Sequence, residues 1–581
     1  MTLSTGTWRV MPLCRLFRWF GHFVVACIGL SLLVGAAADV LPPLRSRVEE
    51  RPFTRPPGVP EDEVLQGSGA VIGEVRIVRV NVFDPAIEAE NTALFQLANR
   101  IHVVTRESTI AAQLLFRAGD RYDPRVLKES ERVLRSHEYL RSARIVPVAY
   151  RDGVVDIEVR TEDTWTLKPE IQFGRKGGEN TSGFGIEEHN LFGTGGRLAL
   201  KAKSDVDRDS RMIEYGDSAF AGSRWQVGAQ LANNSDGHAQ VLDVQRPFYA
   251  LDSRWAAGVH LRNEQRVDPV YDAGSIVERY QTHEREATAF GGWSAGLSGR
   301  WATRWTAGLT FDERRAAALV SDNPAARLPA DRRLIYPWVG VEVVEDDFRE
   351  TRNQDQIGRT EDLALGWRAK VRLGFSTPAL GSDRHAVVFD ASAAKGVQTS
   401  DPDTHTLLWN VAAVGRMADG RLEDSVFGLA ARYYWRQTPK RTLFIGASVE
   451  RGVNLDVDKQ LMLGGDNGLR GYPLRYRTGQ GRWLLTVEER AFTDWYPYRL
   501  LNVGGAVFYD MGATWGGSQV PIIPPPSSTQ PNVLKDIGFG LRLGNSRSAL
   551  GNVIHIDVAF PLNGDASIHK VQFIVEAKRS F

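Results

Sequence analysis

The sequence predicts a mainly β protein in which a large transmembrane antiparallel β-barrel follows a small α/β domain. Apolar and polar residues alternate from Trp165 to the end of the chain, as in strands with one apolar face. Several alternating segments have 9–13 residues, close to the ~9–11 that a tilted strand needs to cross a bilayer. After Ala38, no apolar run approaches the ~18–20 residues of a membrane helix.

The alternation is clearest between Leu363 and Phe375, which is expected to be one strand. Its apolar face carries Leu, Trp, Ala, Val and Phe, and its other face carries Arg368, Lys370 and Arg372. In an outer-membrane barrel the apolar face contacts lipid and the polar face lines a wet lumen. Because only helices and closed barrels satisfy their backbone polar groups in lipid, these strands should close into a ring. The alternative is a large periplasmic β protein with an apolar interior.

Composition excludes several function classes. The 71 Lys and Arg nearly balance the 70 Asp and Glu, whereas a nucleic-acid binder usually shows a clustered basic excess. The two cysteines, Cys14 and Cys27, both lie in the first 40 residues, so the rest has no disulfide, thiolate metal site or cysteine nucleophile. No hydrolase, zinc-protease or phosphate-loop motif is present. We therefore expect neither an enzyme nor a cofactor.

The N-terminus has the features of an export signal. Three arginines precede the apolar run Phe23–Val34, and Ala36–Ala38 supplies small residues for cleavage, so residues 1–38 are predicted to be a signal peptide. A lipoprotein box ending at Cys27 is an alternative, although the apolar run continues beyond it. Residues 39–72 are rich in proline and charge and are predicted to be a linker.

Residues 73–163 are expected to form the small domain. A β-branched run ends at Val80, Thr105 is the expected cap of a helix that runs to about Phe116, and Asp123 with the following proline starts a second helix. Asp152 and Gly153 form a hairpin dipeptide between two β-type runs. The order is strand, helix, helix, strand, strand, with residues 85–104 unassigned.

Residues 164–581 hold between 16 and 20 alternating segments. An even count places both ends of a barrel on the side of the small domain. The short connectors Thr493–Leu500 and Gly544–Asn552 then fall in the periplasm, and the long connectors Arg451–Arg482 and Gly512–Asp536 fall outside the cell. Outer-membrane barrels have this asymmetry.

Motifs throughout the barrel region give a resemblance to a known family. They are Asn190–Gly195, Gly464–Tyr472, Glu488–Arg490, Phe508–Gly512, Gly538–Arg542, His555–Leu562 and a terminal Phe581. In this order they resemble the BamA/TamA-like outer-membrane assembly factors, a superfamily of bacterial surface antigens related to two-partner secretion transporters. Residues 73–163 resemble a POTRA domain of that superfamily.

The resemblance implies a 16-stranded barrel and a loop that folds back into its lumen. This loop would carry Leu469, Arg470, Gly471 and Tyr472, and Arg470 would bind two anchors on neighbouring strands, Glu488 and Asp510. The chemistry suits this role, since a planar guanidinium holds a carboxylate in two parallel hydrogen bonds. The alternative is that Arg470 is a solvated loop residue and Glu488 is simply a polar side chain that lines the lumen.

The first and last strands would meet at a seam marked by Pro169, Phe173 and Phe581. Proline has no N–H and belongs at strand edges, so Pro169 would weaken this closure. The alternative, that Pro169 precedes the paired segment, is equally open.

The function that the resemblance implies is assembly or translocation of proteins in the bacterial outer membrane. An unfolded, β-rich client would add a strand to the sheet edge of the hairpin Ile145–Val159, and the seam would then template or pass it. The partners would be such clients and outer-membrane lipids, with no nucleic acid. The alternatives are a porin-like channel and a lipid-transport barrel.

Overall fold

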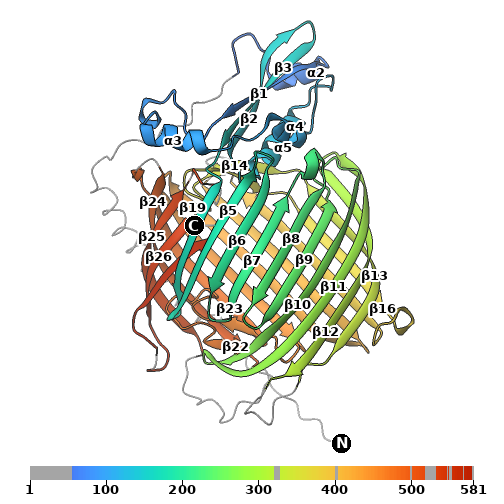
Figure 1. Cartoon of the computed structure of the whole chain (residues 1–581), viewed down its shortest axis with the longest axis vertical. Coiled ribbons are helices and arrows are strands. Elements are labelled where there is room, and N and C mark those ends of the chain that lie inside the picture. Colours follow the sequence, from blue (N-terminus) through green and yellow to red (C-terminus); the bar gives the residue numbers. More distant parts are fainter. Residues whose placement is uncertain are drawn as a thin grey trace, which may run out of the picture.

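The computed structural model describes residues 55–319, 328–399, 404–497, 500–516, 532–545, 547–548, 553–566 and 568–578. They form a closed antiparallel β-barrel with a small α/β domain over one end (Figure 1). We call that end of the barrel the proximal rim and the other end the distal rim. The predicted signal peptide, residues 1–38, lies outside the described residues.

The small domain has the expected order of strands and helices, with one more helix in the stretch left unassigned. Its sheet has the order β1-β3-β2, with β3 in the centre, parallel to β1 and antiparallel to β2. The side chain of Asp123 accepts the N–H of Arg125 and so caps α5. The elements are α2 (Asp62–Gly67), β1 (Val71–Val80), η1 (Glu88–Glu90), α3 (Ala93–Ile101), α4 (Glu107–Gln113), α5 (Pro124–Arg135), β2 (Leu140–Arg151) and β3 (Val154–Asp163).

Two local predictions for this domain are wrong. The linker does not extend to residue 72, because α2 forms within it and buries Leu65 completely in the core of the domain. Thr105 does not cap α4, which has Arg106 at its N-cap. The N–H and hydroxyl of Thr105 donate instead to the carboxylate of Asp163, at 2.8 and 3.0 Å.

The barrel strands follow one another around the ring in chain order, and each is antiparallel to its neighbours. They are β4 (Leu167–Lys176), β5 (Glu179–Leu191), β6 (Gly196–Ser204), β7 (Asp209–Asp217), β8 (Gln226–Asn234), β9 (Gly237–Arg246), β10 (Trp255–Asp272), β11 (Ser275–Ser298), β12 (Trp301–Ala318), β13 (Arg332–Glu345), β16 (Arg368–Ser376), β17 (Ala386–Gln398), β18 (His405–Ala418), β19 (Arg421–Thr438), β20 (Arg441–Val453), β23 (Gly481–Phe492), β24 (Leu501–Trp515), β25 (Leu534–Asn545), β26 (Val553–Pro561) and β27 (Gln572–Lys578).

The expectation of 16 strands is wrong, because 20 strands close the ring among the described residues. The number 16 came from the resemblance, whereas the alternating segments allowed up to 20. Short pieces such as Phe184–Leu191 proved to be parts of full strands, here β5. A ring of this size encloses a wide lumen, since barrels of 16–18 strands already enclose an aqueous channel.

The outer face of the barrel is apolar, with exposed tryptophans near the proximal rim. Trp255 begins β10 and Trp301 begins β12, and their side chains are 44% and 42% exposed. Trp495, in the loop between β23 and β24, is 47% exposed. Further along the strands, alternate apolar side chains such as Leu309 of β12 also face outward. Outer-membrane barrels show this distribution of an apolar band edged by aromatic residues.

Two smaller sheets complete the fold. One is a hairpin of β14 (Phe348–Arg352) and β15 (Thr360–Ala364), and the other pairs β21 (Leu461–Leu463) with β22 (Arg477–Gly479). Short 3₁₀ turns η2 (Phe220–Gly222) and η3 (Pro378–Leu380) lie in barrel loops. None of the helices in the described part of the chain is long and apolar enough to span a membrane.

Candidate functional site

The guanidinium of Arg470 lies inside the barrel and binds two carboxylates. Its Nε and Nη2 donate to the two oxygens of Asp510 at 2.7 and 3.0 Å, and its Nη1 donates to Glu488 at 2.9 Å. Arg470 lies in the connection between β20 and β23, residues 454–480, which we call the distal loop. All three side chains are buried. The structure thus brings together three residues that the sequence analysis places in one site.

Residues that the sequence analysis did not single out enlarge this cluster. Arg490 donates to Glu488 at 3.0 Å, and Arg542 lies 3.5 Å from Glu488 and pairs with Asp557. Asp557 is 3.6 Å from Arg470. All of them belong to the motifs quoted above. Spacing could have revealed Arg490, because residues two apart on a strand, such as Glu488 and Arg490, share a face.

The neighbours of the central arginine hold the distal loop against the wall. Leu469 is fully buried in an apolar cluster, and the hydroxyl of Tyr472 donates to the carbonyl oxygen of Lys535 at 2.8 Å. A Cβ on Gly471 would lie 2.5 Å from the Cβ of Asp536, so only glycine allows the loop to approach this closely. The four residues of the predicted motif therefore act as one structural unit.

The distal loop spans the barrel near the distal rim. Asp456 lies 3.1 Å from Arg314 of β12 and 3.1 Å from Arg416 of β18. Arg314 also pairs with Asp458, and both side chains are almost fully buried. Because β12, β18 and β24 are spread around the ring, these contacts place the loop across the lumen rather than along one wall.

A hairpin that the sequence analysis did not predict enters the other end of the lumen. Residues 346–367, which include β14 and β15, form this hairpin plug. At its tip, Asp355 accepts hydrogen bonds from Tyr434 at 2.8 Å and Arg432 at 3.2 Å, both on β19. Ile357 packs in a buried cluster with Phe492, Ala506 and Val553 of β23, β24 and β26. The plug therefore crosses from β13 and β16 to the far wall.

The prediction of one strand from Leu363 to Phe375 is wrong, because β15 ends at Ala364 and β16 begins at Arg368. The chain leaves the hairpin at Leu365, whose N–H donates to the carbonyl of Asp347, as does the N–H of Gly366. A Cβ on Gly366 would lie 2.3 Å from the carbonyl oxygen of Glu345, so glycine permits the turn. Both β15 and β16 are strands, so a period of two does not reveal that they belong to different sheets.

The small domain contacts the plug through ion pairs. Arg135 of α5 donates to both oxygens of Asp362, at 2.6 and 2.8 Å. Arg144 of β2 donates to Glu350 at 2.9 Å. At the tip, the carbonyl of Gln354 accepts from the same Arg490 that binds the buried carboxylate cluster, at 2.9 Å. The plug thus connects the small domain with the site in the lumen.

A cavity of about 380 Å³ lies between the plug and the distal loop. Its lining is strongly charged and includes Asp355, Arg470, Glu488, Arg490 and Glu576. Among the described residues, no group of three or more His, Cys, Asp or Glu side chains is placed to hold a metal ion. The expectation that the protein needs no cofactor stays a prediction.

The ring closes between β27 and β4, and this seam is sparsely paired. Within the described part of the chain, which stops short of the C-terminus, the two strands pair at one position, Val575 opposite Arg175. The ladder between β26 and β27, by contrast, is continuous from Val553 to Ala559. An ion pair between Lys176 and Glu576 also crosses the seam.

The structure places two of the three predicted seam residues on β4. Pro169 pairs with Ile186 and Phe173 pairs with Ser182, both across the β4–β5 ladder. The described pair of the seam, at Arg175, includes neither of them. Phe581 lies outside the described residues.

The predicted docking edge for a client needs correction. Within the hairpin Ile145–Val159, β3 is the central strand of the sheet and has no free edge. The edge of β2 is partly occupied, since the N–H of Ile145 donates to Glu131 and the carbonyl of Ala143 accepts from Arg135. The other edge strand is β1, which pairs only with β3 in the sheet.

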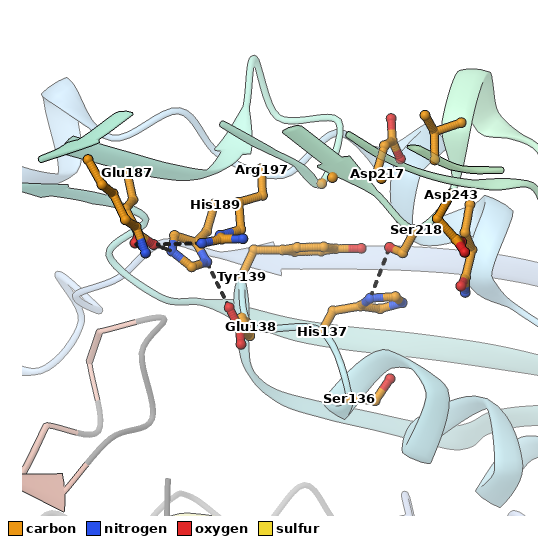
Figure 2. Close-up of a pocket in the computed structure, with 16 residues that line it drawn as sticks. Ser136, His137, Glu138, Tyr139, Glu187, His189, Arg197, Asp217, Ser218 and Asp243 are labelled. Carbon is orange, nitrogen blue, oxygen red and sulfur yellow. Dashed lines mark hydrogen bonds and ion pairs between the residues drawn. The ribbon is translucent and has the colours of Figure 1, made fainter. Parts of the chain in front are cut away.

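A second cavity, of about 660 Å³, lies where the small domain meets the proximal rim (Figure 2). His189 of β5 lies between Glu187 and Glu138, at 2.6 and 2.8 Å. The hydroxyl of Ser218 is 3.4 Å from His137 Nδ1, and the Nε2 of that histidine has no hydrogen-bond partner in the described part of the chain. The pair therefore lacks the third group that orients a catalytic histidine.

Comparison with known proteins gives likenesses of structure alone. No family model matches the chain, and no curated protein does. Among solved structures, BamA from Haemophilus ducreyi lacking POTRA domains 1–3 is 14% identical with a TM-score of 0.38, over 88% of this chain and 85% of that one. CdiB from Escherichia coli is 11% identical with a TM-score of 0.44, over 88% and 77%, and CdiB from Acinetobacter baumannii is 13% identical with a TM-score of 0.40, over 87% and 73%.

Proposed function

We propose that this protein is an outer-membrane assembly or translocation factor that inserts or exports β-rich client proteins at its barrel seam. The barrel would lie in the bacterial outer membrane, with the proximal rim and the small domain in the periplasm. The observation that carries the proposal is the contrast between a lumen occupied at both ends and a seam paired at one described position.

This contrast favours the seam as the route for a client. Removing the distal loop from the lumen would break the buried ion pairs of Arg470, and removing the plug would break the ion pairs that Asp362 makes with Arg135 and Asp355 makes with Arg432. Among the described residues, opening the seam breaks few backbone hydrogen bonds and exposes the edges of β4 and β27. A strand edge of this kind is a template for another strand.

Client docking before insertion is proposed at the edge of β1. The first part of this edge is covered, because the N–H of Ile72 donates to Asp120 and its carbonyl accepts from Gly119. Val75–Val80 therefore offer the remaining edge for strand addition. The same occupied lumen argues against a porin-like channel, which needs an open path.

A disulfide across the seam tests the proposal. In a background with Cys14→Ser and Cys27→Ser, Arg175→Cys with Val575→Cys joins β4 to β27. Ile556→Cys with Val575→Cys joins two strands of the continuous ladder and is the matched control. Each variant is produced in cells lacking this chain, and the outer-membrane proteome is compared.

The seam disulfide should fail to restore the proteins that are lost without this chain, whereas the control disulfide and each single cysteine should restore them. Selective loss of one exported protein would indicate a dedicated transporter, and broad loss a general factor. Full restoration by the seam-locked barrel would contradict the proposal. Unchanged protein levels with altered lipid composition would favour lipid transport instead.

A further inference from the structure

Helix α3 of the small domain exposes an apolar face that nothing in the described structure covers. Leu94, Leu97 and Ile101 are 69%, 52% and 65% exposed. Their spacing of three and four residues places them on one side of the helix. Val103, just after the helix, is also exposed. A group of exposed aliphatic side chains of this kind usually marks an interaction surface.

The opposite side of α3 is firmly held, so this exposure is a property of a packed helix. Phe95 is buried and stacks on Phe83, with ring centroids 4.1 Å apart. The side chain of Asn99 donates to the carbonyl of Phe83 at 2.7 Å and accepts its N–H at 3.1 Å. The helix therefore presents Leu94, Leu97 and Ile101 in a fixed direction.

The helix is also tied to the proximal rim of the barrel. Leu500, in the loop between β23 and β24, packs against the Phe83–Phe95 cluster. Arg547, in the loop between β25 and β26, pairs with Glu90 and donates to the carbonyl of Val82 at 2.6 Å. Figure 1 shows α3 at the edge of the barrel, by the proximal ends of β24 and β25 and away from the centre of the mouth.

This rim is also where the exposed tryptophans of the barrel lie. Trp495 belongs to the same loop as Leu500, and it is 47% exposed. Aromatic side chains of this kind sit at the level of lipid headgroups. From Asn91 to Val103, the sequence contains no acidic residue, and its one arginine, Arg100, is exposed on the polar side of α3. An amphipathic helix without acidic residues can lie on a surface of anionic lipid without charge repulsion.

We propose that α3 docks into the periplasmic leaflet of the outer membrane, with Leu94, Leu97 and Ile101 among the acyl chains. Resting on the proposed placement of the barrel in that membrane, this contact fixes the height of the small domain beside the strands that lead to the seam. The occupant is phospholipid because α3 is tied to the β23–β24 loop, which carries the exposed Trp495 at the rim where the other exposed tryptophans lie.

Site-specific labelling of the full chain tests this docking. With Cys14→Ser and Cys27→Ser, a single cysteine at Leu97 carries an environment-sensitive fluorophore, and the protein is reconstituted in vesicles of phosphatidylethanolamine and phosphatidylglycerol containing a lipid with a nitroxide on its acyl chain. Gln96→Cys, on the polar side of the same helix, is the matched control. Leu309→Cys, exposed on the outer face of β12, reports insertion of the barrel.

Quenching at Leu97 close to that at Leu309 and well above that at Gln96 is the expected result. Quenching at Leu309 together with equal, weak quenching at Leu97 and Gln96 would overturn the docking and leave the placement of the barrel intact. A label at Leu97 that is shielded from aqueous quencher but not reached by the nitroxide would also overturn it, because protein would then cover the face. Absence of quenching at Leu309 would overturn both proposals.

Discussion

At the scale of the residue, the cluster around Arg470 shows what a single guanidinium stabilises. Asp510 is fully buried and Glu488 nearly so, and both depend on charged partners. Arg470→Ala should lower the free energy of unfolding by about 3–5 kcal/mol, because it removes the arginine that binds both oxygens of the buried Asp510. Arg470→Lys should lose less, since it keeps the charge and loses the two parallel bonds to Asp510.

Urea unfolding in detergent micelles measures these differences. Arg451→Ala, at an exposed position at the end of β20, is the control and should change stability by no more than about 0.5 kcal/mol. If Arg470→Ala were as stable as this control, the cluster would contribute nothing to holding the distal loop.

The sequence could reveal the centre of this cluster but not its full extent. Arg470, Glu488 and Asp510 stand in recognisable motifs, and Glu488 and Asp510 occupy strand positions whose side chains bind Arg470 inside the barrel. Asp557 and Arg542 stand in motifs as well, but their contacts depend on the register between β25 and β26. Register is set by long-range pairing, which residue spacing along one strand does not contain.

Glu361 gives the hairpin plug a dependence on pH. Its carboxylate accepts the N–H groups of Gln354 and Asp355, both at 2.9 Å, and burial raises its pKa to about 7. Because the pKa of Glu361 is raised in the folded protein, protonation of its carboxylate stabilises the folded plug. The stability that Glu361 contributes is therefore complete below its ordinary pKa of about 4.5 and is lost as the pH rises through 7.

Hydrogen exchange of the plug amides, corrected for the intrinsic effect of pH, should accelerate between pH 5 and pH 8, within roughly the window that the linkage defines. Glu361→Gln should flatten this dependence. A variant that keeps the wild-type profile would assign the titration to another group.

At the scale of the element, alternation predicted the existence of barrel strands and limited their number to between 16 and 20, a range that includes the 20 observed among the described residues. A period of two identifies a strand but not the sheet that it joins, which is why β15 and β16 were predicted as one strand. The predicted sides of the connectors agree with the structure. The described parts of Thr493–Leu500 and Gly544–Asn552 lie at the proximal rim, and the distal loop lies at the opposite rim. The plug itself carries no signal that distinguishes it from a barrel strand.

Deleting the plug tests its role as a stopper. Residues 348–364 can be replaced by a short Gly-Ser linker, since the backbone atoms of Asp347 and Leu365 are already hydrogen-bonded at 2.8 Å. Conductance across planar bilayers should rise severalfold, because only the distal loop then obstructs a ring that encloses an aqueous channel when it is empty. The same replacement of residues 378–384, which connect β16 to β17 at the distal rim, should leave conductance unchanged. Equal conductance of both deletions would show that the plug does not seal the lumen.

At the scale of the whole molecule, a chain of contacts joins the small domain to the distal loop. Arg135 binds the plug at Asp362, the tip of the plug binds Arg490, and Arg490 binds the carboxylate that holds Arg470. Movement of the small domain should therefore change how firmly the plug is held inside the barrel. Such coupling travels through contiguous contacts that have two arrangements.

Charge exchange at the first contact tests this coupling. Arg135→Glu should speed hydrogen exchange throughout the plug, because it sets two acidic groups against each other at a nearly buried position. Combining it with Asp362→Arg should restore slow exchange in part. Arg117→Glu, at a highly exposed position of the small domain, is the control. Unchanged exchange in Arg135→Glu would mean that the domain and the plug move independently.

The plug and the distal loop have a consequence for the permeability of the cell. One polypeptide supplies both the wall of a wide ring and the two stoppers inside it, so no separate subunit is required to prevent leakage. Bacteria that make the barrel without residues 348–364 should become sensitive to bulky antibiotics that the intact envelope keeps out.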